Sequence, residues 1–194
     1  VATLVQMHPE LHHRIEAFVM VAARRPGQVF RPKPDSPRQF PDFNFESDPI
    51  AMDVLLKSEV PLVFAPWEVS SHVWITNADL ETLRAAGGSG QYIAEKSVSW
   101  IRMWKRMSET DGFNPFDTLA IGYLTHPDTI LRFDAAMTID WREGQLDEEG
   151  EPVPPHLIAD KDAEGGRRAI YCYEPTPAFK PMLMERLAGP AGIE

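Results

Sequence analysis

Apolar and polar positions follow two different patterns along this chain. Nearly continuous apolar runs predict buried strands at residues 15–21 and 60–66, and residues 130–141 and 168–173 also have the composition of strands. Apolar residues at helical spacing predict helices at 91–107 and 181–187. Because buried strands alternate with helices, we expect an α/β fold that is Rossmann-like, with a mostly parallel sheet and helices on both faces.

Two segments interrupt this pattern. The first residues resemble the end of a helix that stops near residues 8–9, so the α/β alternation begins partway through. Residues 24–41 form a basic, proline-rich stretch that fits neither a strand nor a helix. This stretch is either a solvated surface loop or a lid over a site at the carboxyl edge of the sheet. Residues 143–166 are acidic, contain Gly and Pro, and are expected to form a hairpin connection or mobile loop.

The composition excludes several classes of function. The 194 residues carry a net charge of −10, which disfavours a nucleic-acid partner because phosphates are neutralised by clustered Lys and Arg. Cys172 is the single cysteine, so neither an intrachain disulfide nor a cysteine-based metal site can form. No apolar run reaches the length of a membrane span. We therefore expect no membrane association and a cytoplasmic location.

Residues 112–127 contain the first stretch with candidate chemistry. Asn114 is the expected N-cap of a helix that has Pro115 at its first position and ends at Pro127. Asp117 then lies in the first turn, where a helix favours negative charge. On these grounds alone, Asp117 is either a helix-dipole carboxylate or a functional group. The expected buried face of the helix consists of Leu119, Ala120, Tyr123 and Leu124.

Residues 41–49 contain the second such stretch. Asp42 and Asn44 alternate with Phe43 and Phe45, so in an extended segment the polar side chains share one face and the rings share the other. A neighbouring carboxylate and amide can bind vicinal sugar hydroxyls. The alternative is that they are turn residues ahead of a helix that begins at Asp48.

The aromatic residues are compatible with more than one role. The apolar face of the 91–107 helix includes Trp100 and Trp104, which we assign to the core or to a subunit contact. Trp67 and Trp74 follow the end of a predicted strand, where a nucleobase could stack. Thr76, with Asp79 three residues later, is expected to cap a further helix.

Both candidate stretches resemble one family. The sequence DFNFESDPIA has the form (E/D)-F-N-x-x-x-D-P-x-A, and FDTLAIGYLTHP has the form (H/F)-D-x-L-A-x-x-Y-x-x-x-P. These motifs, in this order, resemble those of the inosine–uridine preferring nucleoside hydrolases. The resemblance implies the nucleoside hydrolase fold and hydrolysis of the N-glycosidic bond of a nucleoside by a Ca²⁺-activated water, as part of nucleoside catabolism and base salvage. It also implies that Asp117 is a calcium ligand and that Asp42 and Asn44 bind ribose. Phe116 and Trp67 would lie near the base.

The sequence departs from the family pattern in two places. The aspartate-rich motif D-x-D-x-x-x-D-D, which supplies most calcium ligands and the general base, is absent. In well-known members a His precedes the metal-binding Asp, whereas this chain has Phe116. A phenyl ring cannot protonate a leaving group. We therefore expect residues 1–194 to be the C-terminal part of a single nucleoside hydrolase-like domain that lacks its first strands, contains no catalytic residue of its own and is inactive alone.

Two other interpretations remain open. The chain could belong to a non-catalytic relative that binds a ribosyl ligand or a partner subunit, or it could be a stand-alone interaction domain. The last would expose a long apolar sheet edge, which favours aggregation. The family resemblance also suggests a homodimer or homotetramer.

Overall fold

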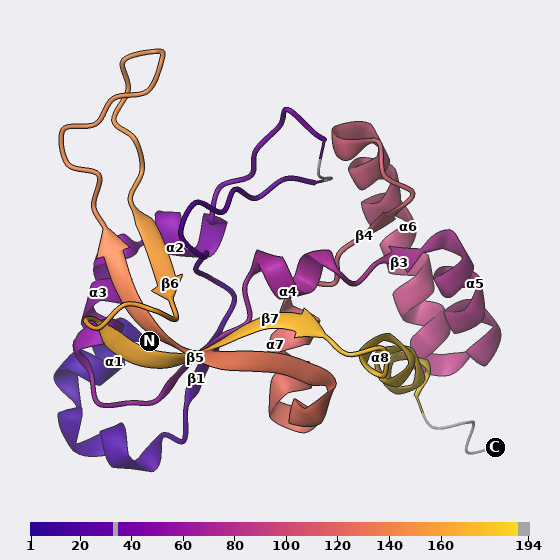
Figure 1. Ribbon diagram of the computed structural model, residues 1–194. Helices are drawn as coiled ribbons and strands as arrows, with labels where there is room; N and C mark the ends of the chain where they lie inside the picture. Colours follow the sequence, from indigo (N-terminus) through magenta and orange to yellow (C-terminus); the bar gives the residue numbers. More distant parts are fainter. Residues whose placement is uncertain (33–34, 190–194) are drawn as a thin grey trace. The chain divides into compact units, whose positions relative to one another are not determined.

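The protein forms a mixed α/β structure, which we describe from a computed structural model over residues 1–32 and 35–189 (Figure 1). Lys33, one of the basic residues of the proline-rich stretch, lies outside the described residues. The chain divides into two compact units that are described separately below. Unit 1 comprises Val1–Phe30, Phe40–Glu68 and Arg132–Tyr173, and unit 2 comprises residues 31–39, Val69–Leu131 and the chain from Glu174 onward.

A five-stranded sheet organises unit 1. Its strands lie in the order β1-β2-β7-β5-β6, with parallel pairing of β1 to β2 and of β2 to β7, and antiparallel pairing of β5 to β6. The expected α/β fold with a central, mostly parallel sheet is therefore confirmed. The strands are β1 (Phe18–Met20), β2 (Leu62–Phe64), β5 (Ile130–Asp140), β6 (His156–Asp160) and β7 (Arg167–Pro175).

Short helices pack on this sheet. The core cluster joins Val5 of α1, together with Met52 and Leu55 of α3, to strand residues that include Phe64 and Tyr171. Asp48 caps α3 as expected, because its carboxylate accepts a hydrogen bond from the Ala51 N–H at 2.9 Å. The helical segments of unit 1 are α1 (Ala2–Met7), the 3-10 helix η1 (Pro9–Arg14), α2 (Phe43–Ser47) and α3 (Pro49–Lys57).

Unit 2 is mainly helical. Its longest helix, α6, confirms the predicted 91–107 helix but begins earlier, and the predicted Thr76–Asp79 capping box is present at the start of α5. Strands β3 and β4 form a small antiparallel pair. The elements are β3 (Ile75–Thr76), α5 (Asn77–Ala86), α6 (Gly88–Ser108), β4 (Gly112–Phe113), α7 (Asp117–Thr125), the 3-10 helix η2 (Pro127–Thr129) and α8 (Phe179–Ala188); α4 (Trp67–Ser71) spans the division between the units.

Two local predictions were wrong. Asp42 and Asn44 do not lie on an extended segment, because residues 43–47 form helix α2; Phe43 is 75% exposed while Phe45 is fully buried. Helix α7 begins at Asp117 with Phe116 as its N-cap, so Asn114 does not cap it. The Asn114 side chain is instead buried and donates to the Val73 carbonyl at 2.7 Å.

Two further differences concern exposure and an unpredicted strand. Leu119 and Ala120 are buried as expected, but Leu124 is 59% exposed because α7 packs through Gly122 rather than through that side chain.

Strand β6 lies within the segment expected to be an irregular connection. Figure 1 shows the loop between β5 and β6 extending away from the sheet, so only part of that segment is irregular.

Gly122 allows a close contact between α7 and α8. A Cβ added at Gly122 would lie 2.4 Å from the Phe179 ring, which is itself fully buried. We expect Gly122→Ala to destabilise the protein by about 1–3 kcal/mol through overpacking, measured by urea denaturation. Gly165→Ala is the control, because a Cβ there meets nothing within 4 Å. Equal stability of the two variants would contradict this packing.

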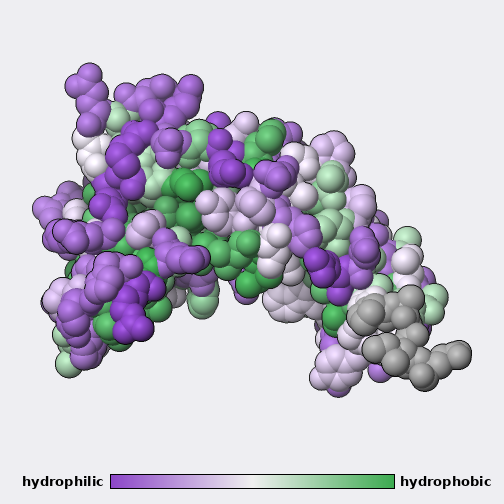
Figure 2. Space-filling view, turned by 90° about the horizontal axis from the view of Figure 1, so that it is seen from below, coloured by the Kyte–Doolittle hydropathy of each residue, from purple (hydrophilic) through white to green (hydrophobic). Residues whose placement is uncertain are grey.

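Apolar side chains remain on the surface (Figure 2). Figure 2 shows apolar surface lying between hydrophilic patches on one face. On α6, Tyr92 is 62% exposed and Trp100 is 42% exposed, so the proposed subunit contact through this helix stays a prediction. Among the helices formed by residues 1–32 and 35–189, none has the length and apolarity required to cross a membrane.

Candidate functional site

The site in unit 1 is built around the segment that leaves β1, Val21–Arg24, which we call the crossing segment. Met20 still pairs with the end of β2, since its carbonyl accepts from the Ala65 N–H at 2.8 Å. Arg24 already pairs with β6: its N–H donates to the Leu157 carbonyl at 3.0 Å, and its carbonyl accepts from the Ala159 N–H at 2.8 Å. The crossing segment is therefore fixed at both ends by backbone hydrogen bonds.

Asp42 is held beneath this segment. Its Oδ2 accepts a hydrogen bond from the Ala23 N–H at 2.7 Å, and the Asp42 side chain is only 4% exposed. Ala23 is fully buried and has a left-handed backbone with φ of 81°. Such a conformation costs a non-glycine residue about 1–2 kcal/mol, so the surrounding contacts must hold it. The strained backbone therefore directs an N–H group at the Asp42 carboxylate.

Asn44 is tied to the same segment. Its Nδ2 donates to the Val21 carbonyl at 2.8 Å, while the residue as a whole remains exposed. The structure therefore brings the predicted pair together, although on a helix start instead of a strand. The buried carboxylate and the exposed amide both depend on the crossing segment for their positions.

Charged neighbours surround Asp42. Glu46 Oε1 accepts from the Asp42 N–H at 2.8 Å and from Arg24 Nη2 at 3.2 Å. Burial raises the pKa of Asp42 to about 6, and the negative charge of Glu46 acts in the same direction; the Ala23 hydrogen bond and the Arg24 charge oppose this rise. Ala23 and Arg24 were not predicted, because only the fold brings them to Asp42. Glu46 was also missed, although it lies only four residues after Asp42 on the same helix start.

Trp67 packs within unit 1. Its ring lies 6.2 Å from that of Phe30 and 5.4 Å from that of Phe40, measured between centroids. The next residue, Glu68, is buried; its carboxylate accepts from the Tyr171 hydroxyl at 3.0 Å and pairs with Arg25. Burial raises the pKa of Tyr171 well above its usual range, so this hydroxyl stays a hydrogen-bond donor. The role of Trp67 in stacking a base stays a prediction.

Phe116 and Asp117 belong to unit 2. The Phe116 ring lies 5.8 Å from the Trp104 ring, and Asp117 is exposed in the first turn of α7 as expected. Within residues 1–32 and 35–189, no group of three or more His, Cys, Asp or Glu side chains is arranged to hold a metal ion. Asp117 is thus a single candidate ligand without neighbouring ligands among the described residues.

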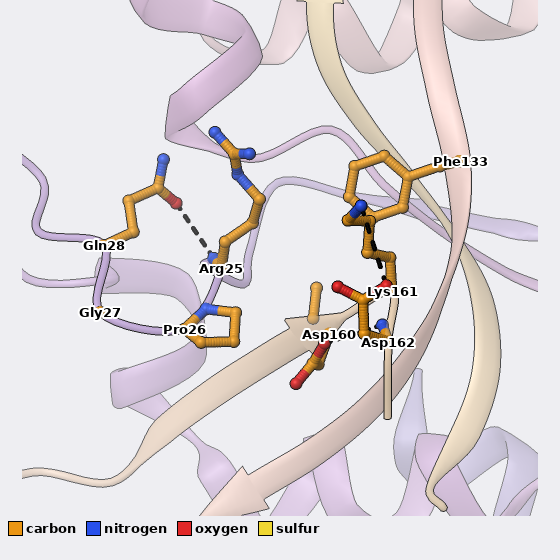
Figure 3. Close-up of a pocket in the computed structure, with 9 residues that line it drawn as sticks. Arg25, Pro26, Gly27, Gln28, Phe133, Asp160, Lys161 and Asp162 are labelled. Atoms are coloured by element: carbon orange, nitrogen blue, oxygen red, sulfur yellow. Dashed lines mark hydrogen bonds and ion pairs between the residues drawn. The ribbon is translucent and has the colours of Figure 1, made fainter. Parts of the chain in front are cut away.

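A cavity of about 350 Å³ opens elsewhere in unit 1 (Figure 3). In Figure 3, Arg25, Pro26 and Gln28 line one side, and Phe133, Lys161 and Asp162 line the other. None of the site residues predicted from the sequence lines this cavity. The cavity nevertheless adjoins the crossing segment, because its lining includes Arg25 and Ala159, and the Ala159 N–H donates to the Arg24 carbonyl.

Comparison with known proteins gives one consistent result. The family model described as inosine-uridine preferring nucleoside hydrolase matches residues 1–167. The pyrimidine-specific ribonucleoside hydrolase RihA of Enterobacter sp. (strain 638) is 32% identical over 137 residues, covering 69% of this chain and 41% of that protein. RihA of Photobacterium profundum is 22% identical over 142 residues, covering 72% of this chain and 44% of that protein. The chain thus spans about two-fifths of the length of these two curated relatives.

Solved structures agree in fold. The plant nucleoside hydrolase PpNRh1 superposes with a TM-score of 0.77 at 16% identity, covering 97% of this chain and 58% of that one. The purine-preferring ribonucleoside hydrolase from Gardnerella vaginalis has a TM-score of 0.76 at 19% identity, covering 100% of this chain and 58% of that one. Both likenesses extend over nearly the whole of this chain and little more than half of the solved one.

Proposed function

Because this chain belongs to the inosine–uridine preferring nucleoside hydrolase family, we propose that it takes part in hydrolysis of the N-glycosidic bond of a ribonucleoside, releasing ribose and a free base. The observation that carries this proposal is the joint placement of Asp42 and Asn44 by the crossing segment. A carboxylate and an amide held side by side suit the vicinal hydroxyls of ribose.

The sugar-binding step uses groups of this chain. Asp42 in its ionised form accepts hydrogen bonds from ribose hydroxyls, and Asn44 offers both a donor and an acceptor. Both groups are held before the sugar arrives, since the Ala23 N–H and the Val21 carbonyl fix them. Such preorganisation lowers the entropy lost when the sugar is oriented for bond cleavage through an oxocarbenium-like state.

A calcium ion is part of the proposal, with Asp117 as one ligand. When bound, such an ion lowers the pKa of a coordinated water. Calcium takes six to eight oxygen ligands, and the described residues do not by themselves form a set of that kind. We therefore propose that the other ligands and the general base come from sequence outside these 194 residues, and that the 194 residues alone are inactive.

The leaving base needs a separate account. Phe116 stands where a protonating His would be expected, and its ring packs with Trp104 in unit 2. We propose that Phe116, and less directly Trp67, contribute apolar contact to the base while another group protonates it. The relatives' names include pyrimidine-specific and purine-preferring enzymes, so we propose a nucleoside substrate without assigning the base.

A second candidate function is a non-catalytic relative that binds a ribosyl ligand or a partner subunit. Phe116 favours it, because a phenyl ring cannot act as an acid. The cytoplasmic location, the role in base salvage and the homodimer or homotetramer stay predictions under either function.

Ribose release tests the proposal. The natural full-length protein is expected to release reducing sugar from at least one ribonucleoside. Asn44→Ala is expected to lower kcat/KM about tenfold, the loss of roughly one hydrogen bond. Ser47→Ala, which removes an exposed hydroxyl that bonds only within α2, is the control. Nucleoside binding with no ribose release from any common nucleoside would favour the non-catalytic function.

A further inference from the structure

Arg24 occupies an unusual place for a cation. The residue is 6% exposed, and its Nε is a buried donor with no hydrogen-bond partner. Its guanidinium lies 4.6 Å from the centre of the Phe30 ring, and its Nη2 donates to Glu46 at 3.2 Å. Burying a guanidinium without satisfying all of its donors costs free energy, and an apolar side chain would often fill such a position at least as stably. Packing alone therefore gives a poor account of Arg24.

The hydrogen bonds that connect Arg24 to Asp42 explain its position better than packing does. The Glu46 oxygen that accepts from Arg24 also accepts from the Asp42 N–H at 2.8 Å. The neighbouring residue on the crossing segment, Ala23, donates to the Asp42 carboxylate at 2.7 Å. Arg24 thus reaches Asp42 by two routes: through its side chain by way of Glu46, and through its backbone next to Ala23.

We propose that Arg24 and Glu46 are positioning residues that together hold the Asp42 side chain and set its charge for ribose binding. The proposal rests on the proposed function, because it concerns the same sugar-binding carboxylate. The cation favours the ionised form of Asp42 and the anion opposes it, so the balance of the two charges adjusts how readily the buried carboxyl group ionises. Neither residue needs to touch the substrate.

The surrounding charges agree with this balance. Burial has the largest effect on the pKa of Asp42 and raises it; Glu46 also raises it, while Arg24 lowers it. From β7, the Tyr171 hydroxyl is close enough for Asp42 to contribute to raising the pKa of that phenol. His156 is a further neighbour of Arg24, with its Nε2 3.5 Å from Arg24 Nη1. Burial lowers the pKa of His156 to about 4, and the positive charges of Arg24 and Arg142 act in the same direction. His156 is therefore neutral near pH 6, and the Arg24–Glu46 pair provides the charges that act on Asp42.

Opposite shifts of the pKa of Asp42 in two variants would distinguish this positioning role from a purely structural one. Arg24→Met removes the cation and leaves Glu46 as an unneutralised anion, so the pKa of Asp42 rises. Glu46→Gln removes the anion and leaves Arg24 unneutralised, so the pKa of Asp42 falls. Both variants break the same ion pair, and a purely structural contact would give changes of the same kind in both.

The test is a carboxyl ¹³C NMR titration of Asp42 in the natural full-length protein, with the signal assigned by its loss in Asp42→Asn. We expect the midpoint to move up by about 1 pH unit in Arg24→Met and down by about 1 pH unit in Glu46→Gln. The low-pH limb of kcat/KM for ribose release should move in the same two directions. Arg24→Lys keeps the charge and should restore a midpoint near that of the unmodified protein, even if Arg24→Met fails to fold.

Arg25→Met is the matched control, because Arg25 pairs with Glu68 in the same unit and leaves the Arg24–Glu46 pair intact. Its Asp42 midpoint should not move. Midpoints that stay constant, or that move in the same direction in Arg24→Met and Glu46→Gln, would overturn the proposal. Opposite movements in a protein that releases no ribose would support the assignment of the charge pair while contradicting the proposed function.

Discussion

Asp42→Asn is expected to remove both the sugar affinity of the site and a pH-dependent cost to folding. An ionised carboxylate that receives hydrogen bonds from ribose contributes about 1.5–3 kcal/mol, so kcat/KM for ribose release should fall about ten- to a hundredfold. Because burial raises the pKa of Asp42 to about 6, the unmodified protein should also show a limb near pH 6 in its activity profile. The variant should lack this limb.

The stability difference between Asp42→Asn and the unmodified protein should also depend on pH. The expected direction is opposite to that for the loss of a carboxylate in an ordinary ion pair. A carboxyl group whose pKa is raised on folding binds its proton more tightly in the folded state, so it stabilises the fold at low pH. That contribution is lost as pH rises from about 4 through about 6 and amounts to about 3 kcal/mol. The free energy of unfolding of the variant, relative to the unmodified protein, should therefore increase across this interval.

Urea denaturation at several pH values between about 4 and 8 measures this difference directly, since the interval spans the unfolded and folded pKa values of the carboxyl group. Asp162→Asn is the control, since its side chain is 79% exposed in the same unit. A stability difference between Asp42→Asn and the unmodified protein that stays constant with pH would show that the Asp42 carboxylate is not destabilised by burial. Full retention of ribose release would remove Asp42 from the sugar-binding site.

Asp117→Ala is expected to lower ribose release by more than about a hundredfold, since changes to residues that merely support metal ligands already cost about 10–100-fold. The proposal makes this carboxylate one of the calcium ligands, and its exposed position in the first turn of α7 leaves it available to an ion. The variant should also require more calcium for half-maximal activity. Calorimetric titration with CaCl₂ provides a measurement that does not depend on turnover.

Asp128→Ala provides the comparison for this prediction. Asp128 is another exposed carboxylate, and it lies in the first turn of the short helix η2 in the same unit. It should leave both calcium affinity and ribose release unchanged. Equal losses in the two variants would indicate a general effect of surface charge, and no loss in Asp117→Ala would remove this residue from the metal site.

Local sequence signals predicted much of the fold. Apolar runs located β1 and β2, because strands in a parallel sheet that is covered on both faces need apolar residues along their length. The composition of residues 130–141 and 168–173 located β5 and β7. The caps at Asp48 and Thr76 were also predicted, since each depends on a side chain and a backbone N–H only three residues apart. Strand β6 was missed because five residues in an acidic, glycine- and proline-rich segment become a strand through pairing with β5.

For the candidate site too, some features follow from local sequence and others only from the tertiary structure. The sequence by itself identified the side chains that we propose carry the chemistry, since Asp42, Asn44 and Asp117 lie in two short motifs. Only the tertiary structure decided how Asp42 and Asn44 are held, because their hydrogen-bond partners Ala23 and Val21 lie about twenty residues away in the chain, on the crossing segment. The pKa of Asp42 has the same origin: desolvation and neighbouring charge depend on the packing of distant residues, which no local pattern of the sequence encodes.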